Sequence, residues 1–229
     1  MITTLNLNRH RKARIWLGEL PNWINQDYPV INRSYSGSHA REVQNIQEFV
    51  RGAMLAPDWG ISSNREPLYP VRSLPYPFVE RVFKLCSPES TSDFAPLQQG
   101  AIEMIIPSGG RALYGLLGGG FLPDRSGELV VKVAVSKKDE LEMPESLASK
   151  FDTVYRGLPG EYADSVLDGI VDAGEILGSG LLLCNCAAHS PVGSSPWMFR
   201  KLALIWVRLI ASQTESVSEE ELTRLVSIE

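Results

Sequence analysis

Apolar residues along positions 101–212 alternate between the period of a strand and the period of a helix, and this alternation constrains the fold most. A strand with one face against a core is apolar at every second residue, and a strand buried on both faces is apolar throughout. Three segments fit these patterns: AIEMII (101–106), ELVVKVAV (128–135) and SGLLLCNCAA (179–188). The sequence therefore predicts a β-sheet in this part of the chain.

Two further stretches place their apolar residues at helical spacing. They are PGEYADSVLDGIVDAGEIL (159–177) and SSPWMFRKLALIWVRLIAS (194–212). The acidic residues of the first stretch lie opposite its apolar face, which is typical of a solvated helix surface. A capping box, Ser218 with Glu221, predicts a short final helix. The predicted fold class is α+β, a β-sheet covered by two long helices near residues 160–177 and 195–212.

Residues 1–100 have a different character. The segment SHAREVQNIQEFVRGAML (38–55) has the spacing of an amphipathic helix. Prolines are dense from Pro57 to Pro96, which predicts extended loop with one short helix after Pro77. The basic run RHRKAR (9–14) fits a solvated amino-terminal arm, with a nucleic-acid patch as the alternative. We therefore predict two parts: an irregular, proline-rich region with one or more helices (1–100) and an α/β domain (101–229).

The composition excludes several classes of protein. The 229 residues are 44% apolar, enough for a sizeable core, and the net charge of −5 gives the whole molecule no attraction for nucleic acid. The apolar runs are too short to span a membrane, and no secretory signal is visible. The three cysteines, Cys86, Cys184 and Cys186, form no disulfide framework. We expect a cytoplasmic protein with free thiols and no membrane or DNA partner.

The sequence offers no catalytic or metal-binding signature. Thiolate and imidazole are zinc ligands, so CNCAAH (184–189) invites that interpretation. On a regular strand, however, Cys184 and Cys186 point to one face and His189 to the other, and no fourth ligand is present. The G-x-S-x-G motif of a serine hydrolase is absent. We therefore predict no catalytic residue, no metal and no cofactor.

Two glycine- or serine-rich stretches are candidate binding sites. PSGGRALYGLLGGG (107–120) fits neither of the common phosphate-binding glycine motifs, and its glycines also suit two tight turns on either side of a short apolar segment. In PVGSSPW (191–197), Ser194 or Ser195 can cap the helix that follows, with Pro196 in its first turn. The same helix N-terminus can bind an anion, so both interpretations stay open.

Taken in order, these motifs resemble domain IV of translation elongation factor G. SGGRALYG (108–115) is similar to the family's T-G-G-R-G-Q-Y-G, LPGEYADSVLDGI (158–170) to its I-P-x-E-Y helix with a later G-I pair, and SSPWMFRKLAL (194–204) to its S-S-E-M-A-F-K-I-A. The resemblance covers residues 101–212 and implies a left-handed βαβ crossover. It also implies a tip that approaches ribosomal RNA, with these binding residues: Ser108, Gly109, Gly110, Arg111, Tyr114, Ser194 and Ser195.

The chain also departs from this family. Ala112 and Leu113 replace small and polar residues of the glycine loop, and LLGGGFLPDRSG (116–127) is an insertion. The GTPase motifs are missing, so the chain is not a translocase by itself. We predict a non-catalytic binding module whose partner is RNA, a ribosomal component or a protein. The alternative is a small-molecule or nucleotide-binding enzyme of the same superfamily, which would hold phosphate with the Gly/Ser-rich loop PVGSSP (191–196).

The role of Arg111 stays open between two interpretations. In a recognition tip, its side chain would project into solvent, where the planar guanidinium can meet a phosphate or a carboxylate. Tyr114 would then stack nearby or anchor the base of the loop. Alternatively, Arg111 pairs with an acidic residue of this acidic half of the chain and fixes the turn.

Overall fold

The computed structural model describes residues 1–7, 11–21, 78–84, 98–108, 110–123, 127–136, 141–173, 176–212 and 218–227. The helix predicted over residues 38–55, and the side chain of Cys86, lie outside these ranges. The described residues form eight strands and three α-helices. The strands are β1 (Ile2–Asn6), β2 (Lys12–Leu17), β3 (Phe78–Lys84), β4 (Gln98–Ser108), β5 (Arg111–Pro123), β6 (Glu128–Ala134), β7 (Tyr155–Arg156) and β8 (Gly180–His189), and the helices are α3 (Ala163–Val171), α4 (Pro196–Ala211) and α5 (Glu219–Val226).

The strands form one mixed sheet in the order β1-β2-β4-β5-β8-β6-β3, with the short β7 paired to the end of β8. All neighbouring strands are antiparallel except β6 and β8, which are parallel. The predicted α+β class is confirmed, and so are strands in all three segments from which a sheet was predicted. The chain returns from β6 to β8 through α3, which is why these two neighbours can be parallel.

Two predictions for the first hundred residues are wrong. Residues 12–17 form β2 instead of part of a solvated arm, because Ala13 and Ile15 alternate with polar neighbours and are buried against the core. Residues 78–84 form β3 instead of a short helix, and they pair with β6 along their whole length. Strands from both halves of the chain therefore share one sheet, which does not divide at residue 100.

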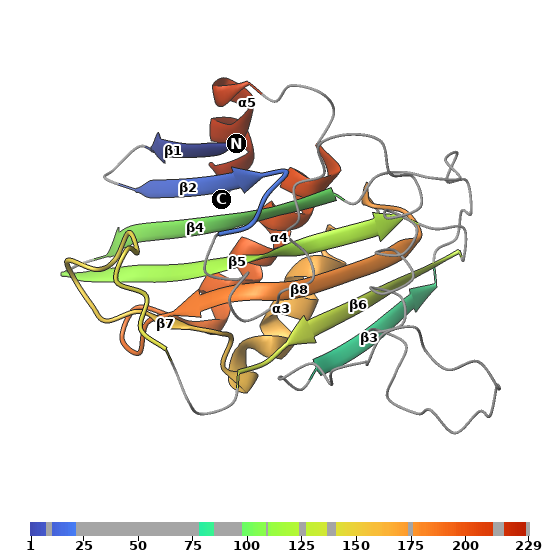
Figure 1. The fold of residues 1–229 in the computed structure, drawn as a ribbon, viewed down its shortest axis with the longest axis horizontal. Helices are drawn as coiled ribbons and strands as arrows, with labels where there is room; N and C mark the ends of the chain where they lie inside the picture. Colours follow the sequence, from blue (N-terminus) through green and yellow to red (C-terminus); the bar gives the residue numbers. More distant parts are fainter. Residues whose placement is uncertain are drawn as a thin grey trace, which may run out of the picture.

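Helices α3 and α4 lie against one face of the sheet (Figure 1). Helix α4 has 16 residues and packs on β4 and β5, with Phe199 and Trp206 fully buried. The hydroxyl of Ser195 accepts a hydrogen bond from the Met198 amide, and that of Ser218 accepts one from the Glu221 amide. The caps predicted for both helices are thus confirmed, and Pro196 lies in the first turn.

The predicted helix over residues 160–177 is shorter in the structure. A 3₁₀ turn, Gly160–Tyr162, leads into α3, which has nine residues. Its acidic stripe is solvated as predicted: the side chains of Glu161, Asp164, Asp168 and Asp172 are exposed. Gly169 lets α3 approach α4 closely, since a Cβ atom at this position would lie 2.2 Å from the carbonyl oxygen of Arg200.

The glycine-rich stretch contains one turn and one long strand, so the second predicted turn is wrong. Gly118 and Gly119 lie inside β5, at a β-bulge where the register with β8 shifts. A Cβ atom on Gly118 would lie 2.4 Å from the Cβ of Ala101, and one on Gly119 would lie 1.9 Å from the Leu183 carbonyl oxygen. Glycine is needed here because neighbouring backbones approach too closely for any side chain.

The same bulge corrects the prediction for the cysteines of β8. Gly118 pairs with Cys186 and Gly119 with Cys184, so Asn185 is the extra residue. An extra residue reverses the alternation of side chains. Cys184 therefore belongs to the core beneath the helices, and Cys186 belongs to the cluster on the opposite face.

No helix covers that opposite face among the described residues; an irregular segment, residues 141–154, does so. Met143, Ala148 and Val154 of this segment pack with Trp16 and Ile105 of the sheet. Figure 1 shows the segment in yellow at one end of the sheet, where the β4–β5 turn also lies.

Candidate functional site

The predicted recognition residues 108–111 form the turn of the β4–β5 hairpin. Ser108 pairs with Arg111, and the backbone of Gly110 has φ of +87°, a left-handed conformation that favours glycine. Gly109 lies outside the described residues. The side chain of Arg111 is exposed, and it makes no ion pair within the described ranges.

The second predicted stretch, the loop between β8 and α4, docks directly on this hairpin. The amide of Tyr114 donates to the Gly193 carbonyl at 2.9 Å. The hydroxyl of Ser194 donates to the Tyr114 carbonyl at 2.9 Å and accepts from the Ser190 amide at 2.9 Å. The structure therefore brings the two candidate stretches together. It also commits the hydroxyls of Ser194 and Ser195 to hydrogen bonds inside the protein.

Asp152 joins the 141–154 segment to the same loop. One of its carboxylate oxygens, Oδ2, accepts hydrogen bonds from the Ser190 hydroxyl and from the Val192 amide, the latter at 3.2 Å. The Ser190 hydroxyl in turn accepts from the Gly193 amide at 2.8 Å. Three separate parts of the chain are thereby fixed to one another at this end of the sheet.

A cleft of about 910 Å³ opens between these three parts and β2. Four cationic side chains and one carboxylate line it, together with backbone, apolar and hydroxyl groups. The charged lining residues are Lys12, Arg14, Arg111, Lys150 and Asp152. Within the described ranges Lys12, Arg111 and Lys150 make no ion pair. The cleft is thus a local concentration of positive charge on an acidic protein.

A buried polar cluster lies beneath the cleft. Glu103, in the middle of β4, is fully buried, and its Oε1 accepts from the Tyr114 hydroxyl at 2.9 Å and from the Leu147 amide at 2.7 Å. Its Oε2 lies 3.2 Å from Nη1 of Arg14. That guanidinium also donates to the Glu145 carbonyl and lies over the Trp16 ring. Arg14 is therefore held in place, and Lys12, Arg111 and Lys150 are the lining cations that make no ion pair among the described residues.

Burial decides the protonation behaviour of this cluster. Desolvation raises the pKa of Glu103, although the Leu147 amide, the Arg14 charge and the Tyr114 hydroxyl oppose that rise. Burial and the neighbouring Glu103 carboxyl raise the pKa of Tyr114 well above its ordinary value. Tyr114 is fully buried and anchors the hairpin to Glu103.

Sequence reasoning missed most residues of this cleft, among them Lys12, Arg14, Lys150 and Phe151. The basic run at residues 9–14 carried a signal, since a nucleic-acid patch was its alternative interpretation. Lys150 and Phe151 carried none, because they reach the cleft only through the tertiary packing of the 141–154 segment.

The cysteines and the histidine of β8 serve the core. Burial raises the pKa of Cys184 to about 12, and burial also raises the pKa of Cys186 well above its usual value, so both remain thiols. Nδ1 of His189 lies 3.1 Å from the Gly157 carbonyl oxygen. Across the described ranges, no three of His, Cys, Asp and Glu side chains are grouped to hold a metal ion.

Comparison of the chain with protein-family models, with curated proteins and with solved structures gives no match. None of the helices in the described ranges combines the length and the apolar character that crossing a membrane requires.

Proposed function

We propose that this chain is a non-catalytic module that binds RNA in the cleft between the β4–β5 hairpin, β2 and the 141–154 segment. The observation that carries the proposal is the set of three cations, Lys12, Arg111 and Lys150, that face this cleft without an ion-pair partner among the described residues. RNA presents a row of phosphates, and unpaired lysine and arginine side chains are the groups that bind them.

The local arrangement outweighs the net charge of the chain. A charge of −5 repels a polyanion over the whole surface, but this repulsion is screened beyond about 8 Å at physiological salt. Among the described residues that line the cleft, Asp152 is the only carboxylate, and its Oδ2 is already engaged by Ser190 and Val192. Phosphate contacts at this site are therefore favourable.

The proposal includes a relationship to domain IV of elongation factor G, with its left-handed βαβ crossover. The succession β4-β5-β6-α3-β8-α4, in which β6 and β8 are parallel neighbours, supports it. So does the position of the hairpin beside the 190–195 loop, because the family's tip approaches ribosomal RNA with the corresponding hairpin. A right-handed connection from β6 to β8 would contradict this relationship.

The test removes single charges and follows the salt dependence of RNA binding. We expect Arg111→Ala to weaken binding and to reduce the slope of log K against log salt by about 0.7, the value for one lost phosphate contact to a single strand. Because Arg111 is exposed, the melting temperature of the variant protein should stay at the wild-type value. Fluorescence anisotropy with labelled RNA, at several salt concentrations, measures both quantities.

Arg224→Ala is the matched control. Arg224 is an exposed arginine in the last turn of α5 and does not line the cleft. The Arg224→Ala variant should bind RNA with wild-type affinity and with the wild-type slope of log K against log salt. Equal effects of the two variants, or tighter binding of ATP than of RNA, would overturn the proposal, the second result in favour of a nucleotide-binding enzyme.

A further inference from the structure

We infer that the cleft takes single-stranded RNA, with one unpaired base stacked on the ring of Phe151. This inference rests on the proposed RNA-binding function and specifies its substrate class. Phe151 lines the cleft next to Lys150 and is 72% exposed. Exposed phenylalanine has no polar group to hydrate, and in a cationic cleft it supplies the flat apolar surface that nucleic-acid bases stack on.

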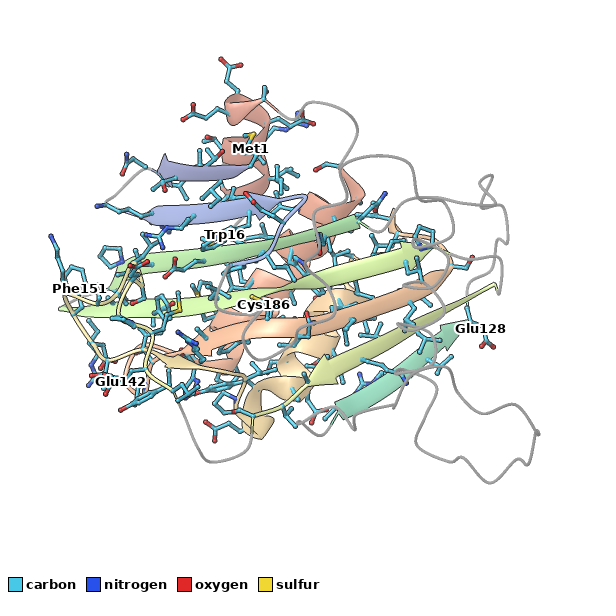
Figure 2. The ribbon with its side chains drawn as sticks, viewed as in Figure 1. Met1, Trp16, Glu128, Glu142, Phe151 and Cys186 are labelled. Atoms are coloured by element: carbon cyan, nitrogen blue, oxygen red, sulfur yellow. The ribbon has the colours of Figure 1, made fainter. Side chains whose placement is uncertain are left out.

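Hydrogen bonds hold the backbone that carries this ring at a defined position. The Phe151 amide donates to the Ala148 carbonyl at 2.8 Å, and the Asp152 amide donates to the same carbonyl at 3.0 Å. Asp152 is then fixed to the Ser190 hydroxyl and the Val192 amide. Phe151 therefore lies on a turn that is bonded on both sides, and a base can stack on it without first ordering the loop. Figure 2 shows Phe151 at the end of the sheet where the hairpin lies.

The groups around Phe151 suit the other parts of a nucleotide. Lys150, Lys12 and Arg111 supply charges for the phosphates on either side of a stacked base. Ser146, another lining residue, is only 6% exposed, and its hydroxyl has no hydrogen-bond partner among the described residues. A buried hydroxyl without a partner is costly, and a base edge or a ribose 2′-hydroxyl would satisfy it.

Stacking selects single strands. In a duplex the faces of the bases are covered by their neighbours, so a protein meets phosphates, 2′-hydroxyls and base edges but no base face. An unpaired base offers its π-face as well. An acidic peptide would match the cations but would leave the ring of Phe151 exposed. The combination of cations and an exposed aromatic ring in one cleft therefore favours RNA.

The experiment compares a short labelled single-stranded RNA with the same strand annealed to its complement. Wild-type protein should bind the single strand more tightly. We expect Phe151→Ala to weaken single-strand binding roughly 5- to 150-fold, the range for loss of one stacked base, and to change duplex binding little. Phe151→Trp should keep the preference, because tryptophan also stacks.

Trp197→Ala is the matched control, since Trp197 is 53% exposed but does not line the cleft. It should bind like the wild type. Circular dichroism melting of each variant checks that the fold is kept.

The outcomes separate this inference from the proposed function. If the wild type binds no RNA, both are wrong. If RNA binds and responds to Arg111→Ala but not to Phe151→Ala, only the stacking inference is wrong. Equal affinity for single strand and duplex also overturns it, as does complete competition by polyglutamate, which would indicate an acidic protein partner. A stacking site also used by mononucleotides would bind uridine monophosphate as tightly as the RNA strand, and that result would contradict a strand-binding cleft.

Discussion

The two faces of the sheet are built in different ways. One face packs against α3 and α4 around an apolar core that includes Ile102, Leu117 and Trp206. The other face is covered by the irregular 141–154 segment and contains the buried Glu103–Tyr114 pair. The second face opens into the cleft lined by Lys12, Arg111 and Lys150, which make no ion pair among the described residues. In the proposed function, the helix face supplies stability and the irregular face supplies the binding surface.

A buried carboxylate is the clearest sign of this division. A fully buried Glu103 is costly unless its oxygens are bonded, and here Tyr114, Leu147 and Arg14 supply partners. These partners come from β5, the covering segment and β2. The polar cluster therefore fixes the three elements that form the cleft. An apolar residue at the position of Glu103 would pack there but would not orient these elements.

The largest expected effect is the truncation of a side chain on the helix face. Trp206 is fully buried, and its Nε1 donates to the Gly100 carbonyl at 2.9 Å. Trp206→Ala should lower the free energy of unfolding by about 4 kcal/mol, because it leaves a large cavity and an unpaired carbonyl. Met143→Ala, beneath the irregular segment, should cost only about 2 kcal/mol, because a loop can collapse onto the gap more easily than a helix. Urea denaturation measures both values. Equal losses of unfolding free energy in the two variants would contradict the difference between the two faces.

The titration of Glu103 should have a smaller effect on the free energy of unfolding. Its pKa is raised by burial, so the folded chain holds this proton more tightly than the unfolded chain does. The contribution of Glu103 to stability is therefore fully present below its ordinary value of 4.5 and is lost as the pH rises through the raised pKa.

Glu103→Gln removes this titration and keeps the size of the side chain. The stability of the variant should rise relative to that of the wild type as the pH increases above 4.5, whereas the two should run parallel below it. Denaturation at a series of pH values measures the difference. A constant difference across that window would show that Glu103 titrates normally in the folded state.

Periodicity predicted the elements whose structure is decided locally. The apolar spacing of 194–212 gave α4 with its Ser195 cap, and strict alternation gave β4 and β6. It failed for β3, because a short segment among prolines joins the sheet only by pairing with β6. It also failed at the bulge opposite Gly118 and Gly119, which depends on how closely two backbones approach.

The candidate site was predictable only in part for the same reason. The hairpin at Ser108 and Arg111 was found through its motif, and the structure places it against the 190–195 loop. The cations of β2 and the ring of Phe151 come from distant parts of the sequence. Neither carries a local pattern, since only the packing of the 141–154 segment against the sheet brings them to one cleft.

The central claim is that the irregular face binds RNA, and hydrogen–deuterium exchange of the backbone amides tests it most directly. On addition of saturating single-stranded RNA, we expect slower exchange at residues 146–152, Val192 and Gly193, which line the cleft. Helix α3, on the opposite face, should exchange at an unchanged rate. Slower exchange confined to α3 or α4, or no change in the cleft at saturation, would contradict the account.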